Sequence, residues 1–267
     1  MHNSDTLLGK ALEILAIAQT MAASPAPAAN PVSNTRKSEA GGIALRLIGG
    51  LAVRARCPSS LRYPFARESS DADFIAQAKA GEIEEVFKSA GWKGDHEFNL
   101  YNGKERLIFR SPEGVKADVF VGRFDMCHAV PLEGRLAVDS ISIPLAELLL
   151  TKLQVVEANV KDLSDVACIL ADHEVGSLDG DTINENRFAT LCAADWGLWR
   201  TATGNLERLR FWSATSIEDA GLRDRILERA DMLAKKAGAW PKTSAWKLRA
   251  AIGDRLRWYK TPEEVEA

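Results

Sequence analysis

The sequence predicts an α/β (α+β) fold, in which a small mixed β-sheet with flanking helices is followed by a helical C-terminal region. Short apolar runs separated by Gly, Pro and Asn between residues 42 and 122 indicate strands. From Pro144 onward, apolar residues recur almost continuously at helical spacing. Residues 24–40 are rich in Pro, Ala, Ser and Asn, as is typical of a linker. The predicted divisions are a helix and linker (1–40), a sheet-bearing core (41–143) and a helical region (144–267).

The N-terminal stretch LLGKALEILAIAQTMAAS (residues 7–24) predicts an amphipathic helix. It lacks the basic n-region of a signal peptide, and Lys10 and Glu13 interrupt it at helical spacing. No run in the chain reaches the roughly 18 to 20 apolar residues that a membrane span requires. We therefore expect no membrane partner, and the ordinary composition, with 46% hydrophobic and 27% charged residues and a net charge of −3, agrees with this.

The cysteines favour reduced thiols in a cytoplasmic protein over a disulfide framework or a zinc site. No two of them form a CxxC pair, and no histidine follows at the spacing of a metal ligand set. The four are Cys57, Cys127, Cys168 and Cys192.

The core opens with GIALRLIGG (42–50), which predicts a buried strand that ends in two glycines. Residues 51–57 predict a short helix that ends before Pro58, because the residue before a proline is disfavoured in the α region. The segment SDADF (70–74) predicts the next strand. Residues 75–92 predict a helix that ends near Gly91.

Three strands are then expected to follow one another as a meander, over residues 96–101, 104–110 and 115–122. Asn102-Gly103 is a strong hairpin signal, and a second turn is predicted at SPEG (111–114). Alternation in the last strand places Asp118 on the face opposite its valines.

The remaining sequence predicts helices over residues 144–160, 161–174, 183–214, 222–238 and 243–260. Residues 187–260 hold 15 Lys and Arg against 8 Asp and Glu, whereas residues 1–186 carry a net charge of −7. A basic C-terminal half suits a polyanion such as nucleic acid or a nucleotide. A solvated helical surface that balances the acidic half explains the same charges. The tryptophans of this half suit base stacking or, more commonly, helix packing.

Asp71 and Asp73 are two residues apart on a predicted strand, so their side chains point to the same side. Two neighbouring carboxylates repel each other unless a cation lies between them, and oxygen ligands of this kind suit Mg²⁺. Asp118 completes a cluster of three carboxylates if its strand is a neighbour. The alternative is a pair of solvated surface acids.

Gly49 and Gly50 supply the other half of the predicted site. Glycine permits close approach of backbone to a ligand, and the helix that starts at Leu51 offers free N–H groups and a positive dipole end to a phosphate. A triphosphate with its Mg²⁺ between these elements is arranged for in-line attack. A tight turn without any ligand is the alternative.

The order of these motifs resembles the polymerase-β-like nucleotidyltransferase superfamily, with IGGLAV (48–53), then RESSDAD (67–73), then KADVFV (116–121). RESSDAD fits the R-x-[ST]-x-D-x-D form that is frequent there, with Arg67 and Ser69 in place. The segment IPLAELLLTKLQVVEANVKDLSDVACIL (143–170) resembles the helical segment of AbiEii-type nucleotidyltransferases. The tail also looks like that of a bacterial nucleotidyltransferase group, so the resemblance covers roughly residues 41 to 260.

The resemblance implies a role for each motif residue. Gly49 and Gly50 would form the phosphate loop, beside which Arg67 and Ser69 belong to the nucleotide site. Mg²⁺ or Mn²⁺ would be held by Asp71, Asp73 and Asp118, the last either as a ligand or as the base that deprotonates the acceptor. This chain departs from many members by having Gly50 in place of serine.

The resemblance also implies that Lys152 contacts nucleotide phosphate and that Lys161 and Asp162 shape the nucleotide pocket. The two lysines are nine residues apart, about 180° around one continuous helix. Both reach one pocket only if the helix breaks between them, and Asn159 is a suitable place for that break.

The function expected from the resemblance is transfer of a nucleoside monophosphate from an NTP to an acceptor. Acceptors in the family include RNA 3′ ends, protein hydroxyls and small molecules, and the basic tail favours RNA. Two alternatives stay open. One is a non-catalytic nucleotide- or RNA-binding module of the same fold, and the other is the toxin of a toxin–antitoxin pair, with an antitoxin as partner.

Overall fold

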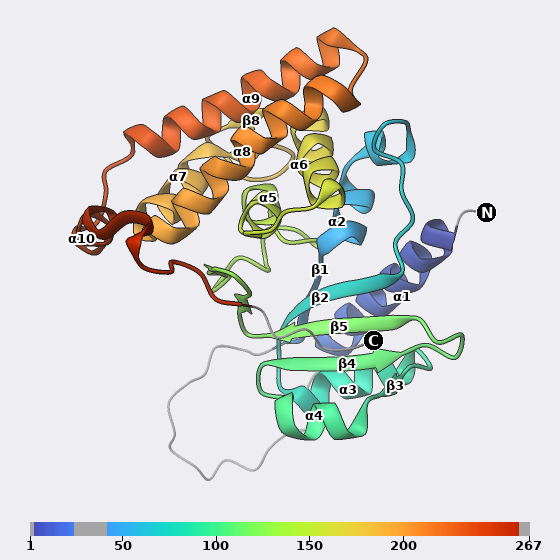
Figure 1. Cartoon of the computed structure of the whole chain (residues 1–267). Helices are drawn as coiled ribbons and strands as arrows, with labels where there is room; N and C mark the ends of the chain where they lie inside the picture. The colour runs from blue at the N-terminus through green and yellow to red at the C-terminus, as the bar shows by residue number, and fades with distance from the viewer. Residues whose placement is uncertain (1–2, 24–41, 262–267) are drawn as a thin grey trace.

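The computed structural model describes residues 3–23 and 42–261 and contains a five-stranded mixed sheet with the order β1-β2-β5-β4-β3 (Figure 1). Only β2 and β5 pair in parallel; the other neighbours in this sheet are antiparallel. The predicted fold class is confirmed, and the predicted linker, residues 24–40, lies outside the described residues. The strands, in sheet order, are β1 (Ala44–Ile48), β2 (Asp71–Gln77), β5 (Lys116–Val121), β4 (Arg106–Arg110) and β3 (Lys93–Gly94).

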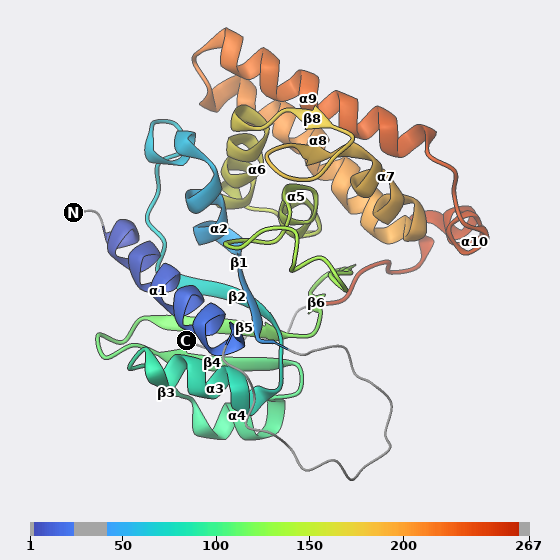
Figure 2. The ribbon, with the colours of Figure 1, turned by 180° about the vertical axis from the view of Figure 1, so that it is seen from behind.

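One face of the sheet is apolar and is covered by two helices, α1 (Asn3–Ala23) and α3 (Ala80–Ser89), which lie in front of it in Figure 2. Phe87 of α3 stacks on Phe109 of β4, with ring centroids 4.0 Å apart, and meets Phe74 of β2 edge-on. All three rings are fully buried or nearly so. The opposite face is left free to carry polar side chains.

Helix α1 is the one described helix that is long and apolar enough to cross a membrane, judged by length and composition alone. It packs on β1, β2, α2 and α3, and it buries Leu7, Ala11 and Ile14 at helical spacing. Its polar side chains make surface contacts, such as the ion pair from Lys10 to Glu113. Helix α1 is therefore amphipathic, as predicted, and packs one face against the sheet.

The strand predicted over residues 96–101 is wrong, because this segment is the helix α4 (His96–Asn102). Asp95 caps it by accepting a hydrogen bond from the Phe98 N–H. The Asn99 side chain accepts from the Ile108 N–H at 2.7 Å and donates to the Ile108 carbonyl at 3.1 Å. The Asn99 side chain therefore bonds the N–H and the carbonyl of Ile108, which a neighbouring strand would otherwise do. The chain at Asn102-Gly103 ends this helix and does not form the predicted hairpin turn.

Two predicted boundaries also move. The strand expected to end at Phe74 continues to Gln77, because β1 pairs with it from Asp73 to Gln77, which lies opposite Ala44. The helix expected from residue 75 consequently begins at Ala80. In the C-terminal half, Asp195 caps a new helix and divides the segment predicted as one helix over residues 183–214.

The C-terminal half is helical, as predicted, and joins the sheet through α2 (Figure 1). Helix α2 follows β1 directly and contacts both α5 and α6. Trp196 meets Trp258, and Trp199 meets Trp246, so these rings serve in packing. The helices are α2 (Gly49–Arg56), α5 (Leu145–Leu153), α6 (Val160–Asp172), α7 (Glu185–Ala194), α8 (Trp196–Ser216), α9 (Ala220–Ala239) and α10 (Ser244–Ile252). Short elements complete the described chain: η1 (Pro58–Leu61), β6 (Phe124–Asp125), β7 (Ala129–Val130), β8 (Val175–Gly176), β9 (Ile183–Asn184) and η2 (Gly253–Arg255).

The aromatic cluster under the sheet generates a prediction for stability. Phe87→Ala removes a fully buried ring that contacts Phe74 and Phe109, so the free energy of unfolding should fall by about 3 to 5 kcal/mol. Chemical denaturation followed by circular dichroism measures this change. Phe211 is 76% exposed on α8, so Phe211→Ala should change the free energy of unfolding by no more than about 0.5 kcal/mol. Equal effects of the two substitutions would contradict the described core.

Candidate functional site

Three carboxylates lie on the polar face of the sheet, where the two parallel strands meet. Asp73 of β2 is the register partner of Asp118 of β5, so their side chains share a face on strands about 4.8 Å apart. Asp71 precedes Asp73 by two residues and points the same way. Asp71 is exposed, Asp73 half-buried and Asp118 buried. The sequence-based expectation that β2 and β5 are neighbours is confirmed, and the three acids form a graded row from solvent to core.

Asp73 is the electrostatic centre of this row. Burial, followed by the negative charges of Asp71 and Asp118, raises the pKa of Asp73 to about 7, while Lys152 and Arg106 act in the opposite direction. Among the described residues, none donates a hydrogen bond to its carboxylate. An acid held in this way favours either a proton or a cation.

Arg106, which the sequence reasoning missed, neutralises Asp118 from the neighbouring strand. Its Nε donates to Asp118 Oδ1 at 2.7 Å and its Nη2 donates to Oδ2. Lys116 Nζ lies 3.8 Å from Oδ2. On sequence alone Arg106 is one of several arginines, and only the antiparallel register of β4 with β5 places it on the polar face.

Gly49 must be glycine for two reasons. Its φ is +67°, and a Cβ there would lie 2.3 Å from Asp73 Oδ2. The first residue of α2 is therefore in close contact with the carboxylate of Asp73. The N-cap residue of α2 is Ile48, whose side chain offers no capping bond, so within residues 3–23 and 42–261 the N–H groups of the first turn have no side-chain cap. Such N–H groups are a suitable place for an anion.

The Arg67 side chain fills the space beside Gly50. A Cβ at Gly50 would lie 2.5 Å from Arg67 Nη2. Arg67 in turn forms a two-pronged bond with Asp165 of α6, with Nε–Oδ1 at 3.1 Å and Nη2–Oδ2 at 2.6 Å. Arg67, from the RESSDAD segment, therefore covers the predicted phosphate loop at Gly50.

Lys152 joins this group from α5. Its Nζ lies 2.8 Å from Asp165 Oδ2 and 3.5 Å from Asp162 Oδ1, and its side chain is 14% exposed. Burial opposes the charge of Lys152, but Asp165 and Asp162 prevail and raise its pKa. Asp165 is 5% exposed, and Lys152 with Arg67 holds its pKa low against burial. Asp165 was missed as a site residue, although it is the last residue of the motif KDLSD.

The helix break expected between Lys152 and Lys161 is confirmed, because α5 ends at Leu153 and α6 begins at Val160. Asn159 caps α6 by accepting from the N–H groups of Lys161 and Asp162. The break turns Asp162 toward Lys152, whereas the Lys161 side chain is exposed. The structure does not bring Lys161 into the group.

Ser69 lines a small pocket with Gly50, Arg67 and Asp165, and its backbone is bonded to α1. It is buried, and its N–H donates to Ser4 Oγ of α1 at 2.8 Å. Ser4 in turn donates to Glu68. In this structure Ser69 anchors the strand entry to α1.

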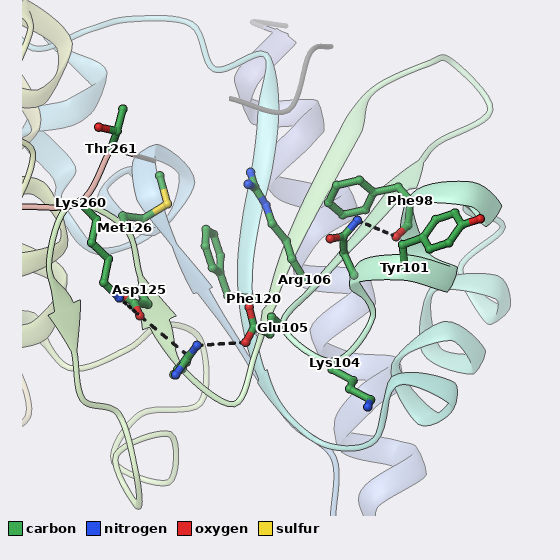
Figure 3. Close-up of a pocket in the computed structure, with 12 residues that line it drawn as sticks. Phe98, Tyr101, Lys104, Glu105, Arg106, Phe120, Asp125, Met126, Lys260 and Thr261 are labelled. Atoms are coloured by element: carbon green, nitrogen blue, oxygen red, sulfur yellow. Dashed lines mark hydrogen bonds and ion pairs between the residues drawn. The ribbon is translucent and has the colours of Figure 1, made fainter. Parts of the chain in front are cut away.

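An open pocket of about 500 Å³ adjoins the acidic row (Figure 3). Arg106 lies in it between Phe120 on one side and Phe98 on the other, and its guanidinium is 5.2 Å from the Phe120 ring centroid. The lining also includes Tyr101 and Lys104, together with two cations that are paired with carboxylates of the same pocket: Arg123 with Glu105, and Lys260 with Asp125. Flat rings beside positive charges suit an aromatic anion.

No family model matches the chain, and no curated protein matches it significantly. The functional argument therefore rests on the geometry of this site.

The raised pKa of Asp73 predicts a pH-dependent effect of Asp73→Asn. The pKa of aspartate in an unfolded chain is about 3.9, and in the folded chain that of Asp73 is about 7. Between these values the folded state binds a proton that the unfolded state has lost, so this carboxyl makes the metal-free wild type less stable as the pH rises. Asparagine does not titrate. The stability of Asp73→Asn relative to wild type should therefore grow from about pH 4 to about pH 7 and then stay constant.

Denaturant titrations in EDTA over this pH range measure the difference. Glu84→Gln, at an exposed position of α3, is the matched control and should give a small difference from wild type without this rise. A stability difference for Asp73→Asn that is flat across the range would show that Asp73 is an ordinary exposed acid.

Proposed function

We propose that the protein is a metal-dependent nucleotidyltransferase, which moves a nucleoside monophosphate from an NTP to an acceptor. The observation that carries this proposal is the register of Asp73 beside Asp118, with Asp71 on the same face and Gly49 of the α2 N-terminus against Asp73 Oδ2. Carboxylates for a divalent ion and N–H groups for a phosphate meet at one point.

The carboxylates fit Mg²⁺ or Mn²⁺ to different degrees. Asp71 and Asp73 offer hard oxygen ligands, and Asp73 is the acid whose burial and neighbours make a cation favourable. Both oxygens of Asp118 accept from Arg106, but each carboxylate oxygen has a second acceptor position. Asp71 and Asp73 would hold the ion, with Asp118 as third ligand or as base. The bound ion would stabilise charge on the attacking and leaving oxygens.

The chain itself would bind and orient the triphosphate. The N–H groups at the start of α2 would donate to phosphate oxygens, as anions commonly bind at helix N-termini. Lys152 is close enough to affect the charge of Asp73, so its ammonium lies toward the same place. Asp165 binds both Lys152 and Arg67 and so holds them in position, with Arg67 covering Gly50.

The pocket around Arg106 suggests where a nucleobase or an RNA acceptor would lie. It places Phe98, Tyr101 and Phe120 near Lys104, and it is connected to the acidic row through Arg106, which binds Asp118. Stacking on such rings, together with charge attraction to phosphates, is how single-stranded nucleic acid binds proteins. This favours RNA among the acceptor classes. Cytoplasmic location and an antitoxin partner stay predictions.

A non-catalytic nucleotide- or RNA-binding module is the second candidate. The observation that favours it is the closed state of the site, in which Arg106 engages both oxygens of Asp118 and Arg67 covers Gly50. A binding module would keep these ion pairs, whereas an enzyme must share or open them when Mg²⁺-NTP binds.

Incubation with each α-³²P-labelled NTP, Mg²⁺ and total RNA or cell lysate tests the enzyme proposal. Label should pass to an acceptor with the wild type, and Asp73→Asn should reduce transfer by at least about a hundredfold, the scale of a lost transition-state contact. Glu84→Gln should transfer like wild type. NTP binding without label transfer, by a protein that responds to Mg²⁺, would decide for the binding module.

Arg106→Gln should show by its stability whether Asp118 belongs to the metal site. It leaves the buried Asp118 short of its main partner, so without metal the free energy of unfolding should fall by about 2 to 3 kcal/mol. If Asp118 joins the metal site, saturating Mg²⁺ should stabilise Arg106→Gln more than wild type, because the ion replaces the missing charge. Thermal melts with and without Mg²⁺ measure this. Equal Mg²⁺ effects in both proteins would remove Asp118 from the ligand set.

A further inference from the structure

A second group of metal-ligating side chains lies at the other end of α2, away from the carboxylates. Cys57 follows the last turn of α2, and Cys168 and Asp172 are on α6. One ligand atom from each of these three lies within 4.8 Å of the other two. His173, the next residue, places its Nε2 3.7 Å from Cys57 Sγ. No cysteine and histidine stand at ligand spacing along the sequence, but folding brings Cys57 beside His173 from a distant segment.

We propose that Cys57, Cys168 and Asp172 form a structural site for Zn²⁺, with His173, which touches Cys57 but lies outside the 4.8 Å group, turning in as the fourth ligand. A tetrahedral zinc ion has Zn–S bonds of about 2.3 Å and Zn–N bonds of about 2.0 to 2.1 Å, which places a sulfur and a nitrogen ligand about 3.6 Å apart. The measured 3.7 Å between Cys57 and His173 matches this edge. Two thiolates, one imidazole and one carboxylate make four ligands, and thiolate donors select zinc over Mg²⁺ or Ca²⁺.

The neighbours of these ligands resemble the outer shell of a metal site. His173 Nδ1 faces the Asp181 carbonyl oxygen at 3.2 Å and its carboxylate at 3.1 Å, so the proton belongs on Nδ1 and the Nε2 lone pair points to Cys57. Ser59 donates to both oxygens of Asp172, with its N–H at 2.8 Å. These bonds fix the carboxylate and leave acceptor positions free.

Both cysteines are enclosed where α2 packs against α6. Cys57 is 0% exposed and Cys168 1% exposed. When both thiols bind zinc, their S–H bonds break and up to two protons pass to solvent. The closed surroundings leave no open coordination position, so the ion is structural.

The position of the site indicates which elements a bound zinc ion would hold together. Helix α2 spans eight residues, or roughly 12 Å, from Gly49 at the acidic row to Cys57. Helix α6 carries Asp165, the partner of Lys152 and Arg67, one turn before Cys168. A zinc ion between these helices would fix the phosphate-binding end of α2 relative to the helical half.

Cobalt binding to the reduced, metal-free wild type tests the proposal. One equivalent of Co²⁺ should produce a near-ultraviolet thiolate-to-cobalt charge-transfer band and the visible spectrum of a tetrahedral ion, and Zn²⁺ should displace it. Zn²⁺ at about a hundredfold excess over its Kd should raise Tm by about 5 to 10 °C. Cys57→Ser and Cys168→Ser should each weaken the band, and the double variant should lose it.

Two control variants locate the signal. Cys127→Ser changes another buried cysteine and should keep the band. Asp73→Asn should keep it too, which distinguishes this site from the carboxylates of the proposed enzyme. Absence of the band in the folded, reduced wild type would overturn the proposal whether or not the variants fold. The band in the double variant, or a Cys57–Cys168 disulfide whose reduction yields no Co²⁺ site, would do the same.

Discussion

The parallel pairing of β2 with β5 sets Asp73 beside Asp118 on one face of the sheet, and the surrounding structure compensates for that concentration of negative charge. Parallel register fixes the two carboxylates as neighbours, so their repulsion cannot be relieved by rotating one strand. Arg106 therefore binds Asp118 from β4, while Asp73 is left with a raised pKa. The unrelieved acid supports the proposed cation site, since a well-paired acid would have no need of a cation.

A second charge cluster connects the sheet to the helical half. Asp165 of α6 receives Lys152 from α5 and Arg67 from the loop before β2. With the nearby Asp162, the cluster holds two positive and two negative groups at the edge of the acidic row. Ion pairs of this kind stabilise little by themselves, but breaking one buried member is costly. The cluster thus favours one arrangement of the two halves, in which Lys152 lies toward the proposed triphosphate position.

Helix α2 links both proposed metal sites. At its first residue, Gly49 lies against Asp73, and after its last turn Cys57 lies beside Cys168 and His173. The oxygen ligands at one end suit Mg²⁺, and the sulfur and nitrogen ligands at the other suit Zn²⁺. Helix α2 would therefore contact a catalytic ion at one end and a structural ion at the other, each held by a different kind of ligand.

The sequence by itself determined the fold class, the shared face of Asp71 and Asp73, and the break before α6, because strand alternation and helix capping are local properties. Tertiary structure decided the rest. Residues 96–101 became a helix because Asn99 could bond Ile108 across the chain, which no local pattern predicts. Arg106, Asp165 and the Cys57–Cys168 contact depend on strand register and helix packing between distant segments. Local sequence fixes the direction of a side chain along its own element, whereas its partner is fixed only when the elements pack.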